Sequence, residues 1–523
     1  MSGESTTAAG SGGVGRATLV VSGLTLMSRL TGLVRDAVLA ATLGLSVWAD
    51  IFFLAFLVPN LFRRLFGEGA LSSAFIPAYS RVRERAGEAK RFAGAVLMWT
   101  AGVTAVLVLV GWLVLWGLSV VFVGSERAQA TLWLAGWMLP YMPLVCLVAL
   151  LGGLLQVHGV FAPAAAVPMV LNAGLITAAV LAGGSGEPSE VAFALSLGVL
   201  GAGVLQLAWV GLSVSRRGLL ERGGAEDLGE VKAMAVRMLP MAVGLGVFQV
   251  NALMDHLIAF VLSPGSAEAA VISWLPGEPG YPIESGSVAA LQWSQRLYQF
   301  PLGVFGIAVA TAAFPLLAKV AGDRLRFAAA LRQGLGLSLT LTLPASVGLM
   351  LVCEPLVGLI YERGAFGEQA TERVAALLLA YGSAVWAYSM THVLTRGCYA
   401  LDRPSAPLRV MAWTVPLNLV LNLTLVWPLG AEGLAWSTAI AAMVQVWGLM
   451  WVLRERLDAG LLREAGLTVL ATVVMGLCVW LVDRQLVAQG DAVRVVVAVV
   501  VGMGVYGLVA WPLGLLGLLR RVT

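Results

Sequence analysis

Long apolar stretches recur along this chain from end to end. The stretches 95–123 and 467–482 contain no charged residue, and the longer of them exceeds the roughly 20 helical residues that cross a bilayer core of about 30 Å. Neither stretch alternates between apolar and polar positions, as the strands of a membrane barrel would. Because backbone groups inside lipid must be satisfied within the protein, the pattern predicts an all-α polytopic membrane protein.

The same pattern predicts about fourteen membrane spans, each about 20 residues or more in length. The second span is the least typical, because charged and polar residues crowd both of its ends. The expected spans are 17–44, 48–66, 93–123, 131–156, 163–183, 191–214, 234–262, 288–318, 333–360, 374–400, 407–428, 433–453, 465–482 and 492–516.

Basic residues between the spans predict the orientation. If the N-terminus is cytoplasmic, the inside loops 81–91, 216–232 and 319–332 are rich in Lys and Arg. The long outside loop 263–287 has neither Lys nor Arg. The other outside loops hold few basic residues, such as Arg127, Arg363, Arg373 and Arg484. This asymmetry follows the positive-inside rule and predicts that both termini are cytoplasmic.

Composition supports a membrane protein and argues against nucleic-acid binding. The chain is 59% hydrophobic and 12% charged, against about 25% charged residues in soluble domains. The net charge of +4 comes from basic residues scattered over short loops, not from one basic face. The cysteines Cys146, Cys353, Cys398 and Cys478 all lie in apolar segments. They are expected to be buried hydrophobic residues, with no disulfide framework or zinc site.

An internal repeat predicts two lobes. The segment from Pro163 to Asn172 resembles the segment from Pro407 to Asn422, and a helix with Gln and Trp follows each. The order is the same in both halves, which indicates two parallel lobes of six helices around a central cavity. The expected organisation is a disordered tail at 1–16, an N-lobe at 17–214, a cytoplasmic linker at 215–233, a C-lobe at 234–453 and two additional spans within 454–523.

Ionisable residues inside the spans are the best pointers to function, because a charge at mid-membrane costs roughly 2.5–3.5 kcal/mol on insertion scales. The polar and charged candidates are Ser28, Arg29, Arg35, Asp36, Asp50, Asn60, Arg63, Arg64, Glu68, Asp255, His256 and Arg296. Spacing places Arg29 and Asp36 on one helix face, with Arg35 pointing elsewhere unless Gly32 kinks the helix. The guanidinium groups either form internal salt bridges or bind a phosphate-bearing substrate, whose oxygens match their geometry.

A second group of polar residues predicts a cation site. Asp255 lies in the seventh span, Asn418 and Asn422 lie one turn apart in the eleventh, and Thr438 lies near the start of the twelfth. Their carboxylate, amide and hydroxyl oxygens suit a hard cation such as sodium. The alternative is that the two asparagines join helices by hydrogen bonds and that Asp255 pairs with His256 or an arginine. No other cofactor is expected.

Several motifs resemble those of the MurJ (MviN) family of lipid II flippases. They are Ser28-Arg29-Leu30-Thr31-Gly32-Leu33-Val34-Arg35-Asp36-Ala37, the segment from Ala49-Asp50 through Val58-Pro59-Asn60-Leu61-Phe62-Arg63-Arg64 to Glu68-Gly69-Ala70, Ala74-Phe75-Ile76-Pro77, Arg296-Leu297 with Phe300-Pro301-Leu302-Gly303-Val304, Tyr361-Glu362-Arg363-Gly364-Ala365-Phe366 and Arg396-Gly397-Cys398-Tyr399-Ala400. The resemblance covers nearly the whole chain and is most specific in its first hundred residues.

The resemblance implies a flippase of the multidrug/oligosaccharidyl-lipid/polysaccharide exporter superfamily. Its substrate would be lipid II, the undecaprenyl-pyrophosphate-linked disaccharide-pentapeptide, moved from the cytoplasmic to the outer leaflet of the bacterial inner membrane by alternating access. The family's cavity arginines correspond to Arg29, Arg35, Arg63 and Arg296, with Asn60 and Ser28 beside them. The supporting residues are Asp36, Asp50, Arg64 and Glu68. Spans thirteen and fourteen would hold the polyprenyl tail. The expected partners are membrane lipids and, in addition, cell-wall synthesis proteins.

One departure from the family concerns Arg296. Acids often flank this arginine in the family, whereas Gln295 and Gln299 flank it here, so the family's local salt bridge is not carried over. The alternatives are an exporter of another lipid-linked oligosaccharide and a cation-coupled drug exporter. A drug exporter would favour acids and aromatics, since its usual substrates are cations. No nucleotide-binding motif or catalytic set is present in the sequence, so we expect no enzyme activity.

Overall fold

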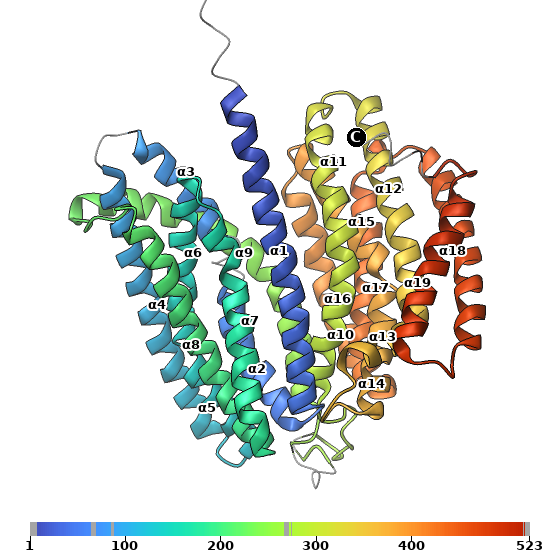
Figure 1. Cartoon of the computed structure of the whole chain (residues 1–523), viewed down its shortest axis with the longest axis horizontal. Helices are drawn as coiled ribbons and strands as arrows, with labels where there is room; N and C mark the ends of the chain where they lie inside the picture. Colours follow the sequence, from blue (N-terminus) through green and yellow to red (C-terminus); the bar gives the residue numbers. More distant parts are fainter. Residues whose placement is uncertain are drawn as a thin grey trace, which may run out of the picture. The chain divides into compact units, whose positions relative to one another are not determined.

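The computed structural model describes residues 8–63, 70–84, 88–265, 271–273, 275–515 and 517. By its contacts the chain divides into two units (Figure 1). The first comprises Met1–Leu253 with Gly265–Ala267, and the second comprises Met254–Pro264 with Glu268–Thr523. The helices of the first unit are α1 (Ala8–Leu43), α2 (Val47–Phe62), α3 (Ala70–Arg83), α4 (Glu88–Val121), α5 (Glu126–Met138), α6 (Tyr141–Val157), α7 (Ala162–Ala182), α8 (Pro188–Ser215) and most of α9 (Leu228–Val261).

The second unit is also mainly helical in its described residues, apart from turns and the segment between α9 and α10. Its helices are α10 (Ser287–Pro301), a π-helical turn (Leu302–Gly306), α11 (Ile307–Lys319), α12 (Arg324–Leu351), α13 (Cys353–Tyr361), α14 (Glu368–Gly382), α15 (Val385–Ala400), α16 (Ser405–Leu429), α17 (Ala431–Val452), α18 (Gly460–Gln485) and α19 (Asp491–Ala510). The expected all-α polytopic architecture is therefore confirmed.

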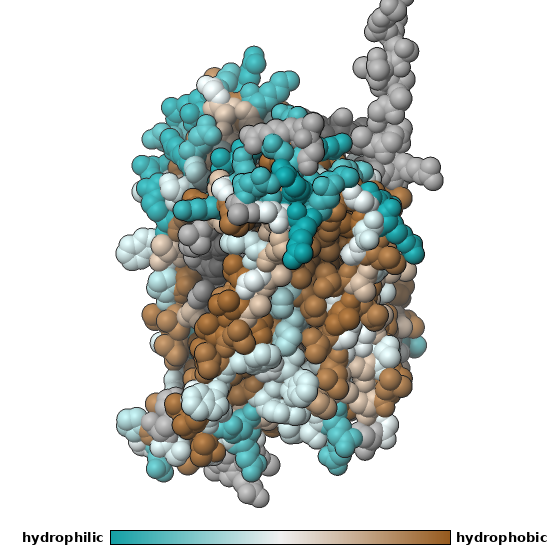
Figure 2. Space-filling model, turned by 90° about the vertical axis from the view of Figure 1, so that its left-hand side faces the viewer, coloured by the Kyte–Doolittle hydropathy of each residue, from teal (hydrophilic) through white to brown (hydrophobic). Residues whose placement is uncertain are grey.

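Length and hydropathy make eleven segments of the described residues able to cross a membrane. The helix Val47–Phe62 is apolar but shorter than these. The count of about fourteen spans stays a prediction. Wide apolar surfaces support a lipid environment, because only 11% of the apolar window of α4 is buried inside the protein. Figure 2 shows the face of the first unit, where brown apolar side chains form a broad band beneath a hydrophilic end.

Several expected element boundaries were wrong. The expected span 333–360 divides at Val352 into α12 and α13. The expected span 288–318 agrees with the candidate span Ser287–Lys319. It contains a π-helical turn directly after Pro301, because proline has no N–H to continue the regular bonding pattern. Residues 8–16 were expected to be part of a disordered tail, but α1 begins at Ala8. Once the membrane segment has nucleated a helix, adding a further residue is easy. Residues 1–7 lie outside the described part.

The start of α9 belongs to the core of the first unit. Val231 and Met234 are buried in the same cluster as Tyr79 of α3 and Phe92 of α4. This packing explains why the boundary between the units falls within α9 and not at the expected linker, 215–233. The expected lobe boundaries otherwise stay a prediction.

The segment before α9 is docked closely on α4. The amide of Glu221 donates to the carbonyl of Lys90 at 3.2 Å, and Arg91 forms an ion pair with Glu226 at 2.6 Å. A Cβ atom added at Gly94 would overlap the carbonyl oxygen of Glu221. Glycine at this position therefore permits the backbone contact between α4 and the segment before α9.

In the second unit, α18 and α19 lie beside α12 and α13 (Figure 1). Val352, Met475, Val479 and Ala498 form a small buried cluster between them. Arg494 of α19 makes two hydrogen bonds of 3.0 Å with the carboxylate of Asp483 in α18. The two C-terminal helices thus form a hairpin with its own polar clasp.

Candidate functional site

Arg35 and Asp36 of α1 form an ion pair, and Asn172 of α7 completes the group. Arg35 donates to Asp36 Oδ1 from Nε at 2.9 Å and from Nη2 at 2.5 Å, and its Nη1 donates to Asn172 Oδ1 at 3.0 Å. Asn172 also donates to the Ser28 carbonyl at 3.2 Å and to the Thr31 hydroxyl at 3.1 Å. The expectation that Arg35 points away from Asp36 was wrong, because a long guanidinium side chain can fold back onto an adjacent residue.

Arg29 has a different environment from Arg35, although both are in α1. Its side chain is exposed, and no hydrogen bond or ion pair joins it to another described residue. Ser28 beside it is half-buried. Compared with Arg35, Arg29 has the guanidinium that is available to an anion.

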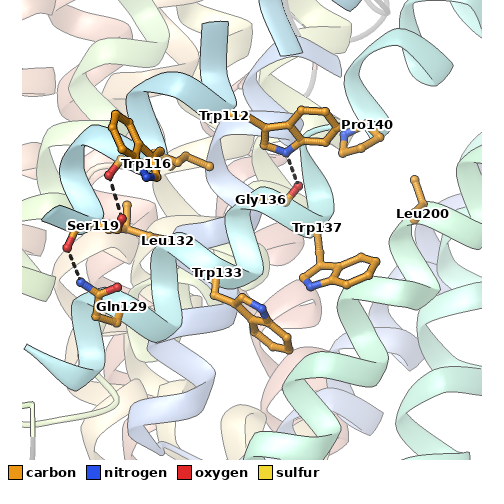
Figure 3. A pocket seen from close by; sticks show the side chains of 11 residues that line it. Trp112, Trp116, Ser119, Gln129, Leu132, Trp133, Gly136, Trp137, Pro140 and Leu200 are labelled. Atoms are coloured by element: carbon orange, nitrogen blue, oxygen red, sulfur yellow. Dashed lines mark hydrogen bonds between the residues drawn. The ribbon is translucent and has the colours of Figure 1, made fainter. Parts of the chain in front are cut away.

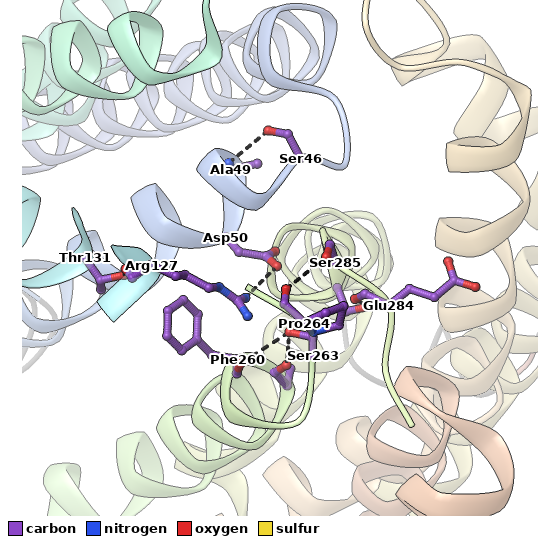
Figure 4. Close-up of polar contacts among 12 residues, drawn as sticks. Ser46, Ala49, Asp50, Arg127, Thr131, Phe260, Ser263, Pro264, Glu284 and Ser285 are labelled. Carbon is purple, nitrogen blue, oxygen red and sulfur yellow. Dashed lines mark hydrogen bonds and ion pairs between the residues drawn. The ribbon is translucent and has the colours of Figure 1, made fainter. Parts of the chain in front are cut away.

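Asp50 of α2 forms a buried ion pair with Arg127 of α5. Arg127 Nη2 lies 3.2 Å from Asp50 Oδ2, and the two side chains are 6% and 0% exposed, respectively (Figure 4). Ser46 caps the start of α2 by accepting a hydrogen bond from the Ala49 amide at 3.2 Å, which fixes the helix turn that carries Asp50. Arg127, one of the few basic residues expected in the outside loops, lies in the first turn of α5, and its side chain is buried.

The end of α2 carries Asn60 and Arg63. Arg63 Nε donates to Asn60 Oδ1 at 3.0 Å, so these two predicted residues are in contact. Arg64 and Glu68 lie outside the described residues. Pro59 lies inside the helix just before this group.

Arg296 is half-buried in α10 of the second unit. The neighbouring Gln295 donates to the hydroxyl of Tyr381 at 3.1 Å. Tyr298 stacks against Tyr381 and Tyr388, with ring centroids 5.2 and 5.3 Å apart. The helix turn that bears Arg296 is therefore held by aromatic packing and a neutral hydrogen bond.

The four residues predicted as a cation site come together in the second unit. Asn422 and Asn418 donate to Asp255 Oδ1 at 2.6 and 3.3 Å, and Thr438 donates to Asp255 Oδ2 at 2.9 Å. Asp255 is 1% exposed, and both asparagines are 0% exposed. The side-chain oxygen of Asn422 is buried and has no hydrogen-bond partner among the described residues.

These side chains contain the kinds of oxygen that bind a small hard cation, and in the structure the amides and the hydroxyl donate to the carboxylate. The three groups that contact the Asp255 carboxylate are neutral, so the group keeps a full negative charge when Asp255 is ionised. A rotation of the Asn422 amide would turn its unpartnered oxygen towards the carboxylate. Carboxylate, amide and hydroxyl oxygens are the ligands that cations of this class take.

Two contact residues were missed from the sequence. Asn172 lies in the first repeated segment, and the second repeated segment carries Asn418 and Asn422. That correspondence was a usable signal for a polar site in α7. Arg127 carried no comparable signal, because an arginine near a predicted loop is ordinarily solvated.

Comparison with known proteins places the chain in a family. A family model described as "Lipid II flippase MurJ" matches residues 39–501. A "Probable lipid II flippase MurJ" of Rhizobium tropici is 32% identical over 529 residues, covering 96% of this chain and 95% of that protein. A protein with the same description from Rhizobium meliloti (strain 1021) is 34% identical over 475 residues, covering 87% of this chain and 84% of that protein.

Solved structures show the same fold. "Lipid II flippase MurJ, inward closed conformation" superposes with a TM-score of 0.77 at 23% identity, covering 95% of this chain and 99% of that one. An inward-facing multidrug resistance MATE family transporter of the MOP superfamily gives a TM-score of 0.61 at 14% identity, covering 85% of this chain and 99% of that one. The match of the family model over most of the sequence, together with these relatives, shows that the chain belongs to the MurJ family.

Proposed function

We propose that this protein moves lipid II from the cytoplasmic to the outer leaflet by alternating access. The match of the MurJ family model over residues 39–501 carries the proposal, and relatives that are 32–34% identical bear the name of lipid II flippase. The reaction makes and breaks no bond. The protein has to bind a large anionic head group, shield it from the bilayer core and release it on the other side.

The exposed side chain of Arg29 supports binding of the pyrophosphate. The guanidinium of Arg29 is exposed in a helix otherwise rich in apolar residues. Arg35 is already engaged with Asp36 and Asn172. We therefore assign Arg29 as a pyrophosphate contact, with Arg63, Asn60 and Ser28 assisting. Arg296 is assigned as a contact because its motif resembles that of the MurJ family. Arg35 would act as a second contact that Asp36 orients.

The Asp255 group supports ion coupling. A sodium ion held by Asp255, Asn418, Asn422 and Thr438 would supply a charge whose gradient resets the carrier. The membrane potential offers a separate drive, because an interior-negative potential favours outward movement of an anion by roughly 2.3 kcal/mol per charge per 100 mV. The two drives are distinguishable by varying the sodium gradient and the potential independently.

The basic inside loops support an orientation with both termini in the cytoplasm. A lipid II flippase acts in the bacterial inner membrane, where the precursor is made on the cytoplasmic side. Cell-wall synthesis proteins would then receive the substrate at the outer surface.

The decisive experiment is depletion of the protein in its own cells, with assay of lipid II in the outer leaflet. Wild-type protein should restore the signal, whereas Arg29→Ala and Arg296→Ala should not. Lysine at either position should rescue poorly, because it loses the bidentate fork. Arg409→Ala removes an exposed arginine that is not assigned to the site and should behave as wild type.

Unchanged outer-leaflet lipid II after depletion would contradict the proposed function. It would favour an exporter of another lipid-linked oligosaccharide or of cationic drugs. Normal rescue by both alanine variants, at wild-type protein levels, would instead contradict only the assignment of the arginines.

A further inference from the structure

A cavity of about 540 Å³ lies on the first unit among α4, α5 and α8. Four tryptophans surround it, and no charged residue lines it (Figure 3). The lining residues are Trp112, Leu115, Trp116, Ser119, Gln129, Leu132, Trp133, Gly136, Trp137, Pro140 and Leu200. None of these residues has a part in the site described above.

The cavity opens towards the bilayer. Trp116 and Trp133 are 70% and 52% exposed, on helices whose apolar composition suits a membrane span. Trp112 precedes the end of α4, at Val121, by about 13 Å along the helix axis at 1.5 Å per residue. The cavity thus runs along roughly 13 Å of an apolar helix, close to half of a bilayer core of about 30 Å.

The polarity of the lining changes with depth. Ser119 and Gln129 lie at the end nearest the loop between α4 and α5, where Gln129 donates to the Ser119 carbonyl at 2.6 Å. Deeper, the indole N–H of Trp112 donates to the Gly136 carbonyl at 2.9 Å (Figure 3). Both donors are therefore engaged by the protein itself. The deep end presents ring faces and aliphatic groups, which suit a hydrocarbon chain.

The charge at the shallow end is negative. Glu126 is exposed and lies one turn above Gln129 on α5, and Trp133 lies one turn below it, so the three share a helix face. Arg127, the nearest basic residue in sequence, is buried in its ion pair with Asp50. An amphiphile whose tail fills the cavity would therefore meet an acid at its head group.

We propose that this cavity binds a phospholipid with a primary-amine head group, phosphatidylethanolamine, with one acyl chain between the tryptophans and its ammonium beside Glu126. The site is separate from lipid II binding.

The site can be tested by native mass spectrometry of the full-length protein titrated with phosphatidylethanolamine or phosphatidylglycerol. A Cβ atom at Gly136 would make ordinary contacts of 3.9 and 4.0 Å with Leu115 and Trp112. Gly136→Leu should therefore fold and fill the cavity, lowering affinity for phosphatidylethanolamine by about tenfold or more. Gly117→Leu on α4 is the matched control, because a Cβ atom there meets nothing within 4 Å.

Glu126→Gln tests the head group without changing the cavity. It should weaken phosphatidylethanolamine by about two- to fivefold, as expected for an exposed ion pair, and it should strengthen binding of the anionic phosphatidylglycerol, because a like charge is removed. Equal phosphatidylethanolamine binding by wild type, Gly136→Leu and Glu126→Gln would overturn the proposal. So would stronger binding of phosphatidylglycerol by the wild type.

Discussion

Asn422 donates a hydrogen bond of 2.6 Å to the carboxylate of Asp255, from a position 167 residues further along the chain. Asn418 and Thr438 contact the same carboxylate, so an acid that is 1% exposed has neutral hydrogen-bond donors on both of its oxygens. Burying a carboxylate is costly unless it is well paired. A cation at this point would supply the missing charge.

The first prediction follows from that relationship. Asp255→Asn should abolish any dependence of lipid II transport on a sodium gradient in reconstituted vesicles, because it removes the only full charge among the four predicted ligands. Thr424→Val is the control. Thr424 lies on α16 together with Asn418 and Asn422, and its exposed hydroxyl bonds only to carbonyls of that helix. Wild-type transport that ignores sodium while following membrane potential would exclude the ion site.

The second prediction separates Arg35 from its partner. Asp36→Asn should impair complementation less than Arg35→Ala, because asparagine still offers an acceptor and Asn172 continues to hold the guanidinium at 3.0 Å. An acid directed at a pyrophosphate would repel it, so Asp36 orients Arg35 and does not touch the substrate. The measurement is growth of the depletion strain at matched protein levels. A more severe defect in Asp36→Asn would contradict the assignment.

The third prediction concerns the buried pair of Asp50 and Arg127. Arg127→Met should destabilise the protein by about 3–5 kcal/mol, because it removes the guanidinium that pairs with a buried carboxylate. Adding Asp50→Asn should recover much of that loss. Melting temperatures in one detergent provide the comparison.

Arg91→Met is the control for this pair. It breaks an ion pair with Glu226 whose side chains are 40% and 65% exposed, and it should cost about 1 kcal/mol or less. Equal melting temperatures for Arg127→Met and Arg91→Met would show that burial of the Asp50 pair has no energetic consequence.

The fourth prediction tests docking of the segment before α9. Gly94→Ala should lower the melting temperature, because the added methyl group would overlap the Glu221 carbonyl. Gly102→Ala, on the same helix with nothing within 4 Å, should be neutral or should stabilise by up to about 1 kcal/mol. The reverse order of melting temperatures would mean that the segment is not held on α4.

The fifth prediction is a pH dependence at the end of α6. Burial lowers the pKa of His158 below its ordinary 6.5, and nearby Arg83 lowers it further. The Tyr79 hydroxyl lies 3.0 Å from His158 Nε2, an arrangement that suits a neutral ring as acceptor. Between the two pKa values the unfolded chain binds more protons, so this stabilisation is complete above about pH 6.5 and is lost as pH falls.

His158→Gln keeps an acceptor for Tyr79 but does not titrate. Its melting temperature should therefore fall less steeply than that of the wild type below pH 6.5, while the two curves run parallel above pH 7. The same slope in both proteins below pH 6.5 would show that His158 contributes nothing to acid sensitivity.

The sequence by itself determined the all-α membrane architecture, because runs of about 20 apolar residues have no other stable arrangement in lipid. It also identified the residues that gather around Asp255, which are Asn418, Asn422 and Thr438. Asn418 and Asn422 are one helical turn apart, and buried polar side chains in a membrane protein gather with one another because lipid offers them no partner. Periodicity and scarcity of polar residues were sufficient there.

Only the tertiary structure decided which charges are paired. Whether Arg35 contacts Asp36 depends on the rotamer that Asn172 of another helix stabilises. Whether Arg127 is solvated or buried depends on Asp50, 77 positions earlier in the chain. The same holds for Gly94, whose importance lies in the backbone of Glu221 that packs on it. Such contacts depend on side-chain reach and helix packing across long sequence separations, which local pattern does not encode.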